Sequence, residues 1–277
     1  MAELDWDAAL ELQLRAFRDF VTLLAGSAPE SLEIELDGAV AGAIVPAVPE
    51  RSIVNSVTYR DPRSLAAQLE TLAAVYDEAG VAAWTVWAPE DDSEAIAALE
   101  HAGHVLDGSP LAMVLDLSEL EPADLGDLDW DAGADLELLG TLNDEAYGID
   151  HGSGIAAAFR RFPDGIDLRL YGARVEREPA CVLGTIDHPP RPEAHGPDCG
   201  VYFVATPERF RGRGLATRLM LAALGEARRR GCATSSLQAS ELGEPVYREI
   251  GYRPAFRFKM YERRRGGGQP DDEVAGV

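Results

Sequence analysis

A basic, glycine-rich segment carries the clearest chemical signal in the sequence. It is Arg211-Gly212-Arg213-Gly214-Leu215-Ala216, and it lies between apolar runs at 200–205 and 215–224. The first run is typical of a strand and the second of a helix. The first N–H groups of a helix have no intrahelical partner and attract anions. Since glycine lets a phosphate approach these groups closely, the segment predicts a diphosphate site.

Two common phosphate-binding loops do not match this segment. A dinucleotide-binding loop has a third glycine, where this chain has Thr217, and a Walker loop has Gly-Lys-Ser/Thr, which is absent. A second register that begins at Arg209 also places glycines at 212 and 214. A glycine turn that only starts a helix is the structural alternative, and the segment alone leaves it open.

The segment resembles the acyl-CoA pyrophosphate loop of the GCN5-related N-acetyltransferase (GNAT) superfamily, Arg/Gln-x-x-Gly-x-Gly/Ala. In that family the loop follows strand 4 and opens helix 3, and strand 5, helix 4 and a closing strand come next. This chain has the same order, with a strand at 233–239, a short helix at 244–250 and a strand at 256–261. The run Val246-Tyr247-Arg248-Glu249-Ile250-Gly251-Tyr252 is similar to the helix-4 signature of the family.

The resemblance implies roles for individual residues. In the family, the backbone of strand 4 pairs with the pantetheine arm, and a backbone N–H polarises the thioester carbonyl. A neutral amine attacks directly, and a tyrosine protonates the leaving thiolate. Tyr247 is the expected acid, and a buried core tyrosine is its alternative. The residues expected to bind acetyl-CoA are Phe203, Val204, Ala205, Arg211, Gly212, Arg213, Gly214, Leu215, Ala216 and Thr217.

The general base is left open by the sequence. Asp198 precedes the strand at 200–205, and Glu241 and Glu244 follow the next strand. Each is a candidate, and a solvated carboxylate is the alternative for each. A covalent route through Cys199 lacks a histidine placed by sequence to activate it. No histidines have the His-x-x-x-His spacing of a metal pair, so we expect no metal.

The first half of the chain repeats the order of the second, helix-strand-helix-strand. It has Asp61-Pro62-Arg63-Ser64 in place of the glycine loop and Leu99 in place of Tyr247. This predicts a tandem GNAT protein whose N-terminal copy has lost the cofactor site. Two α/β units that share only local architecture are the alternative.

The expected fold class is α/β (α+β), with two GNAT-like domains that each have a mixed, mostly antiparallel twisted sheet flanked by helices. Strands are expected at 40–48 and 52–59. The expected division is a degenerate domain at 1–120, an acidic linker at 121–131, a catalytic domain at 132–265 and a disordered tail at 266–277.

The composition limits the partners. A net charge of −23 argues against non-specific binding to nucleic acid. It would steer cationic substrates toward the protein, although solubility, or adaptation to a salty cytoplasm, also explains it. No apolar run is long enough to span a bilayer, and the start of the chain is acidic, unlike a secretory signal. With three widely spaced cysteines a disulfide framework is not expected, and the cytoplasm is the expected location.

The expected function is N-acetyl transfer from acetyl-CoA to a primary amine of a small molecule or peptide, by a monomer or homodimer. A non-catalytic acyl-CoA-binding sensor or scaffold is the alternative. The glycines between 148 and 154 indicate a loop that covers the acceptor site. The sequence does not identify the amine.

Overall fold

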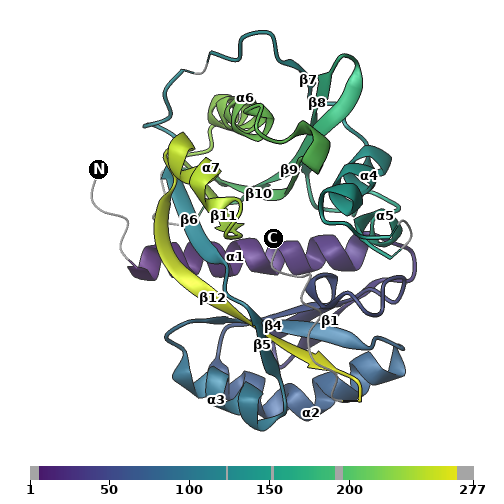
Figure 1. Ribbon diagram of the computed structural model, residues 1–277. Coiled ribbons are helices and arrows are strands. Elements are labelled where there is room, and N and C mark those ends of the chain that lie inside the picture. Colours follow the sequence, from purple (N-terminus) through teal and green to yellow (C-terminus); the bar gives the residue numbers. More distant parts are fainter. Residues whose placement is uncertain (1–5, 123, 151–152, 191–195, 267–277) are drawn as a thin grey trace.

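The computed structural model describes residues 6–122, 124–150, 153–190 and 196–266, so the tail expected at 266–277 lies outside this range except for its first residue. Figure 1 shows one group of strands and helices above the long helix α1 (Trp6–Gly26) and another below it. The other helices are α2 (Pro62–Glu78), α3 (Ser93–His101), α4 (Leu136–Ala146), α5 (Ile155–Ala158), α6 (Leu215–Arg230) and α7 (Glu244–Ile250), with the 3₁₀ helices η1 (Ser52–Val54) and η2 (Glu208–Phe210). The strands are β1 (Leu32–Leu36), β2 (Val40–Ile44), β3 (Ser56–Tyr59), β4 (Ala83–Pro89), β5 (Val105–Gly108), β6 (Leu111–Asp116), β7 (Asp129–Asp131), β8 (Leu168–Val175), β9 (Glu178–His188), β10 (Asp198–Ala205), β11 (Thr234–Ala239) and β12 (Arg253–Arg264).

The strands form one 12-stranded sheet with the order β1-β2-β3-β4-β12-β6-β11-β10-β9-β8-β7, and β5 pairs with β12 beside this path. Of the neighbours in the described part of the chain, β3–β4 and β10–β11 are parallel and the other pairs are antiparallel. Parallel neighbours need a crossover connection, which α2 supplies in the first half and α6 in the second. The expected fold class is confirmed: two similar units with mixed, mostly antiparallel sheets flanked by helices.

The two halves exchange their last strands. Strand β6, from the first half, pairs with β11 from Leu111 to Asp116. Strand β12, from the second half, pairs with β6 through its first residues and with β4 through residues 258–264. Each half-sheet is therefore completed by a strand from the other half. The boundary at residue 120 remains a proposal, and the sheet is continuous across it.

Helix α1 joins the two halves through its apolar face, on which Phe17, Phe20 and Val21 follow one another at helical spacing. The ring centroid of Phe17 lies 4.5 Å from that of Trp87 in β4, and Phe20 stacks on Tyr202 of β10 at 5.2 Å. Burying a phenylalanine side chain contributes about 1.5–3 kcal/mol. These contacts therefore hold the halves against one helix. No helix in the described ranges is both long and apolar enough to cross a membrane.

Several segments differ from the expectations. The strand expected at 40–48 is shorter, because β2 ends at Ile44. The strand expected at 52–59 is η1 followed by β3, because the buried Asn55 amide folds the loop before it. Its Oδ1 accepts from the Val45 N–H at 2.7 Å, and its Nδ2 donates to the Arg51 carbonyl at 3.0 Å. Strand β7 lies inside the expected linker and pairs with β8. Strands β1 and β5 have no counterpart among the expected elements.

Candidate active site

The parallel strands β10 and β11 separate toward their carboxyl ends. Their ladder covers only residues 198–200 and 234–236, and no residue of β10 after Gly200 is paired with β11. A cavity begins at this opening, lined by residues 201–204 of β10 and by Leu237 and Gln238 of β11. The carboxyl ends of parallel strands commonly form a ligand crevice, so the topology places a binding cavity where the sequence predicts the pantetheine site.

Strand β10 carries a bulge at this cavity. Its register with β9 shifts between Tyr202 and Ala205, so that Phe203 and Val204 together stand opposite one residue. Phe203 has a φ of 56°, which is uncommon for a bulky residue, and its ring packs on Phe159 at 5.1 Å. A bulge takes backbone groups out of the ladder. The backbone near Val204 is therefore a candidate to bind a carbonyl oxygen.

Helix α6 begins without a side-chain cap. Gly212 and Gly214 have φ values of 73° and 66°, which favour glycine, and a Cβ at either position would meet no atom within 4 Å. The N-cap is Gly214, and Leu215, Ala216 and Thr217 form the first helical turn. The unpaired N–H groups and the positive end of the helix dipole therefore face open space, which fits a diphosphate.

The equivalent helix of the first half, α2, is already capped. The Asp61 carboxylate accepts from the backbone N–H of Ser64 at 2.7 Å and from its hydroxyl at 2.6 Å. These hydrogen bonds, the one from the hydroxyl first, lower the pKa of Asp61. A carboxylate thus occupies the position that is bare in α6, and Leu99, in the place of Tyr247, is fully buried. Both features are consistent with the expectation that the N-terminal copy lacks the cofactor site.

The arginines of the loop are mostly engaged in holding its shape. Arg211 donates to the carbonyl oxygens of Thr206 at 3.0 Å and Ala146 at 2.7 Å, which ties the loop to the end of α4. Arg209 is paired with two glutamates. Arg213 lies between the two glycines in sequence, is exposed, and has its guanidinium 5.8 Å from the centroid of the Phe210 ring. A diphosphate site here would therefore consist of backbone N–H groups together with Arg213.

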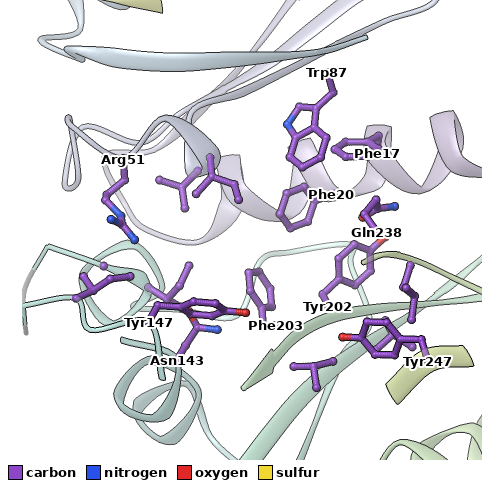
Figure 2. A pocket seen from close by; sticks show the side chains of 18 residues that line it. Phe17, Phe20, Arg51, Trp87, Asn143, Tyr147, Tyr202, Phe203, Gln238 and Tyr247 are labelled. Atoms are coloured by element: carbon purple, nitrogen blue, oxygen red, sulfur yellow. The ribbon is translucent and has the colours of Figure 1, made fainter. Parts of the chain in front are cut away.

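Tyr247 of α7 reaches the same cavity. Its side chain is 8% exposed, and its hydroxyl points into the cavity in Figure 2. The neighbouring Tyr252 hydroxyl is hydrogen-bonded to Ser235 at 2.6 Å, whereas no described residue pairs with the Tyr247 hydroxyl. Burial raises the pKa of Tyr247, so its hydroxyl keeps its proton at neutral pH. The hydroxyl is therefore accessible to a ligand in the cavity, and its role as a proton donor stays a prediction.

Aromatic rings from both halves form the cavity wall (Figure 2). Phe17 and Phe20 come from α1 and Trp87 from β4, and they face Tyr202 and Phe203 of β10. The first half therefore contributes surface to the cavity. The polar side chains that also line the cavity are Arg51, Asn143, Tyr147, Gln238 and Tyr247.

The bases and nucleophile suggested by the sequence do not line the cavity. Asp198 is buried at the start of β10, where it accepts from two β11 hydroxyls at 2.7 and 2.6 Å, and burial raises its pKa. Burial also raises the pKa of the Cys199 thiol. Glu241 is exposed, and Glu244 is paired with Arg248 on the outside of α7. These residues are therefore poor candidates for proton removal from an amine in the cavity.

A hydrogen-bonded chain that the sequence does not predict ends at the cavity wall, with His188 and Tyr202 buried and Asp19 partly exposed. Nδ1 of His188 lies 2.6 Å from Oδ2 of Asp19 in α1, and its Nε2 lies 2.9 Å from the Tyr202 hydroxyl. Since a carboxylate only accepts, Nδ1 carries a proton and Nε2 accepts from Tyr202 when the ring is neutral. The Ala16 carbonyl, 3.3 Å from the Tyr202 hydroxyl, can accept from it when Nε2 is protonated. The chain can therefore hold one additional proton.

Comparison with known proteins identifies relatives of this fold. Residues 139–252 match the model of the Acetyltransferase (GNAT) family. No curated protein matches the sequence.

Solved structures match nearly the whole chain. The GCN5-related N-acetyltransferase from Kribbella flavida is 15% identical, with 96% of this chain and 98% of that chain covered and a TM-score of 0.62. A tandem GNAT protein from the clavulanic acid biosynthesis pathway is 14% identical, with 96% and 97% covered and a TM-score of 0.57. The GCN5-related N-acetyltransferase from Sphaerobacter thermophilus is 19% identical, with 88% and 85% covered and a TM-score of 0.53. At these identities the similarity concerns the fold.

Proposed function

Because residues 139–252 are a domain of the acetyltransferase (GNAT) family and the whole chain has the tandem GNAT fold, we propose that the protein transfers an acetyl group from acetyl-CoA to a primary amine of a small molecule or peptide. The observation that carries this proposal is the position of the Tyr247 hydroxyl, which points into the cavity that begins at the bulge of β10. Thioester aminolysis requires a proton donor for the leaving thiolate and an N–H group that binds the thioester oxygen. Tyr247 and the bulge of β10 would supply these two groups in one cavity.

Each part of the site has a separate task in this reaction. The N-terminus of α6 holds the diphosphate of the co-substrate, and the separated edge of β10 accompanies its pantetheine arm. A backbone N–H at the bulge, near Val204 or Ala205, donates to the thioester oxygen as negative charge develops there. Tyr247 gives its proton to the departing thiolate. The amine attacks directly, and the protein forms no covalent intermediate.

The amine must lose a proton before or during the attack. We propose that the hydrogen-bonded chain of Tyr202, His188 and Asp19 accepts this proton. The proton passes to the Tyr202 hydroxyl while that hydroxyl gives its own proton to Nε2 of His188. The resulting imidazolium donates to Asp19 through Nδ1 and to Tyr202 through Nε2. The Asp19 carboxylate balances the new charge, so no unpaired ion is buried.

His188→Gln is expected to reduce turnover of an alkylamine about 100-fold, the lower end of the usual range for general acid–base catalysis. Turnover of an arylamine, which is already neutral at pH 7, is expected to change only a few-fold. The measurement is the ratio of the two rates in wild type and variant. An equal loss with both amines would mean that His188 only supports the structure.

The function itself is tested by measuring release of the CoA thiol from acetyl-CoA across a panel of amines. We expect release of the CoA thiol to depend on the amine and to be accompanied by an acetylated amine product. The contrasting function is a non-catalytic acyl-CoA-binding module. Tight binding of acetyl-CoA without thiol release from any amine would favour that module.

A further inference from the structure

The cavity has an unusual charge for so acidic a protein. The chain carries a net charge of −23, yet none of the 18 described residues that line the cavity is an aspartate or glutamate. Arg51 is the one among them whose side chain is ionised at neutral pH. An ammonium group buried here would find no carboxylate among the described lining residues, and burying an unpaired charge is costly. The overall charge therefore does not describe what the cavity binds.

Arg51 is held at this position by the loop before β3. Its carbonyl accepts from Nδ2 of the buried Asn55 at 3.0 Å, while Oδ1 of Asn55 accepts from the Val45 N–H at 2.7 Å. The guanidinium extends from this loop into the cavity (Figure 2). The amide of Asn143, a residue that is 5% exposed, lines the same part of the cavity. A guanidinium and a buried amide are suitable donors to a carboxylate.

The groups that line the cavity are ordered along it. In Figure 2, Arg51 and Tyr247 lie at opposite ends, and the rings of Phe20 and Phe203 lie between them. The bulge of β10 is the place where the reacting amine must arrive, and the aromatic rings bury an apolar body next to it. The guanidinium of Arg51 lines the far end.

We propose that the acceptor is an amino carboxylate with an apolar body, whose amine lies near Tyr247 and the bulge and whose carboxylate is bound by Arg51. This inference rests on the proposed function and names the class of its acceptor. Polyamines and other polycations are disfavoured, because the described cavity wall has no carboxylate for a second ammonium group. The N-terminal half therefore selects the acceptor, through Arg51, while the C-terminal half supplies the chemistry.

Three acceptors with one common body test this proposal. They are benzylamine, 4-(aminomethyl)benzoate and 1,4-bis(aminomethyl)benzene, which carry hydrogen, a carboxylate and a second ammonium group at the same position. We expect kcat/KM to be at least about 10-fold higher for the carboxylate than for benzylamine, the usual scale for a hydrogen bond to a charged group, and lowest for the diamine. A highest value for the diamine would overturn the proposal.

Arg51→Gln should raise KM for 4-(aminomethyl)benzoate about 10- to 100-fold, and it should affect the benzylamine reaction much less, because benzylamine has no carboxylate. Arg51→Glu should reverse the order of the carboxylate and the diamine. Arg63→Gln removes the same charge from an exposed site outside the cavity and should change none of these values. If Arg51→Gln affects both acceptors equally, Arg51 does not bind the carboxylate.

Calorimetric titration of the three compounds into the protein with CoA separates this inference from the proposed function. Absence of thiol release from every amine would contradict acyl transfer. In that case, selective and Arg51-dependent binding of 4-(aminomethyl)benzoate would still support the ligand class. Equal binding of the carboxylate and the diamine would contradict it.

Discussion

Tyr247→Phe is expected to lower turnover on the order of 10²–10⁴-fold, the usual scale for general acid–base catalysis. The substitution keeps the ring and removes the hydroxyl that points into the cavity. CoA affinity and melting temperature should barely change, because the contacts to diphosphate and pantetheine are assigned to backbone groups elsewhere and no described residue pairs with this hydroxyl. The measurement is steady-state turnover with one amine, alongside calorimetry and thermal unfolding.

Tyr252 provides a matched control for this prediction. It lies close to Tyr247, with ring centroids 6.0 Å apart, but its hydroxyl forms a hydrogen bond with the Ser235 hydroxyl inside the core. Tyr252→Phe should therefore cost about 1–3 kcal/mol of stability and preserve turnover. If Tyr247→Phe instead retains a near-normal rate and loses stability, Tyr247 is a core residue and protonation of the thiolate falls to water.

Gly214→Glu is expected to weaken CoA binding at least about 100-fold, as several charge-assisted hydrogen bonds would be lost together. The new carboxylate would lie at the bare N-terminus of α6, as Asp61 does at α2. It would occupy the position assigned to the diphosphate and would repel the negative charge of the diphosphate. The measurement is calorimetric titration of CoA into the folded variant.

Two further variants separate charge from backbone strain in this result. Gly214 has a φ of 66°, so Gly214→Ala should cost about 1–2 kcal/mol of stability and only modest affinity. Gly225→Glu adds the same charge within α6, where a Cβ meets nothing within 4 Å, and should leave CoA affinity intact. Unchanged affinity in Gly214→Glu would show that the diphosphate binds elsewhere.

Local signals made the second half of the fold predictable. The glycines at 212 and 214, the strand before them and the helix after them are neighbours in sequence, and backbone sterics link each to one conformation. The same holds for Asp61-Pro62, which predicts a capped helix that cannot bind a phosphate. Tyr247 was predictable because it belongs to a short pattern within α7, although its role remains a proposal.

Contacts between distant segments were not predictable in this way. The chain from Asp19 through His188 to Tyr202 joins α1, β9 and β10, and no spacing in the sequence connects them. The exchange of β6 and β12 between the halves depends on pairing of strands more than 100 residues apart, such as Met113 with Leu237. A strand pattern specifies which face is apolar but leaves the partner open.

The segment around Arg51 shows why a local pattern can also mislead. Residues 52–59 have the composition of one strand, and their apolar residues support that interpretation. Instead, the buried amide of Asn55 accepts a hydrogen bond from the Val45 N–H and donates one to the Arg51 carbonyl, and the chain turns here. A single tertiary network thus replaces half of the expected strand with a loop that carries Arg51 to the cavity.

The structure of the protein with bound CoA is the most direct test of the central claim, that acyl transfer takes place in the cavity between β10, β11 and Tyr247. We expect the diphosphate to lie against the backbone N–H groups of residues 212–216, and the thiol sulfur to lie within hydrogen-bonding distance of the Tyr247 hydroxyl. We expect no CoA at the N-terminus of α2, which Asp61 caps. A diphosphate away from α6, or a sulfur beyond the reach of Tyr247, would contradict the claim.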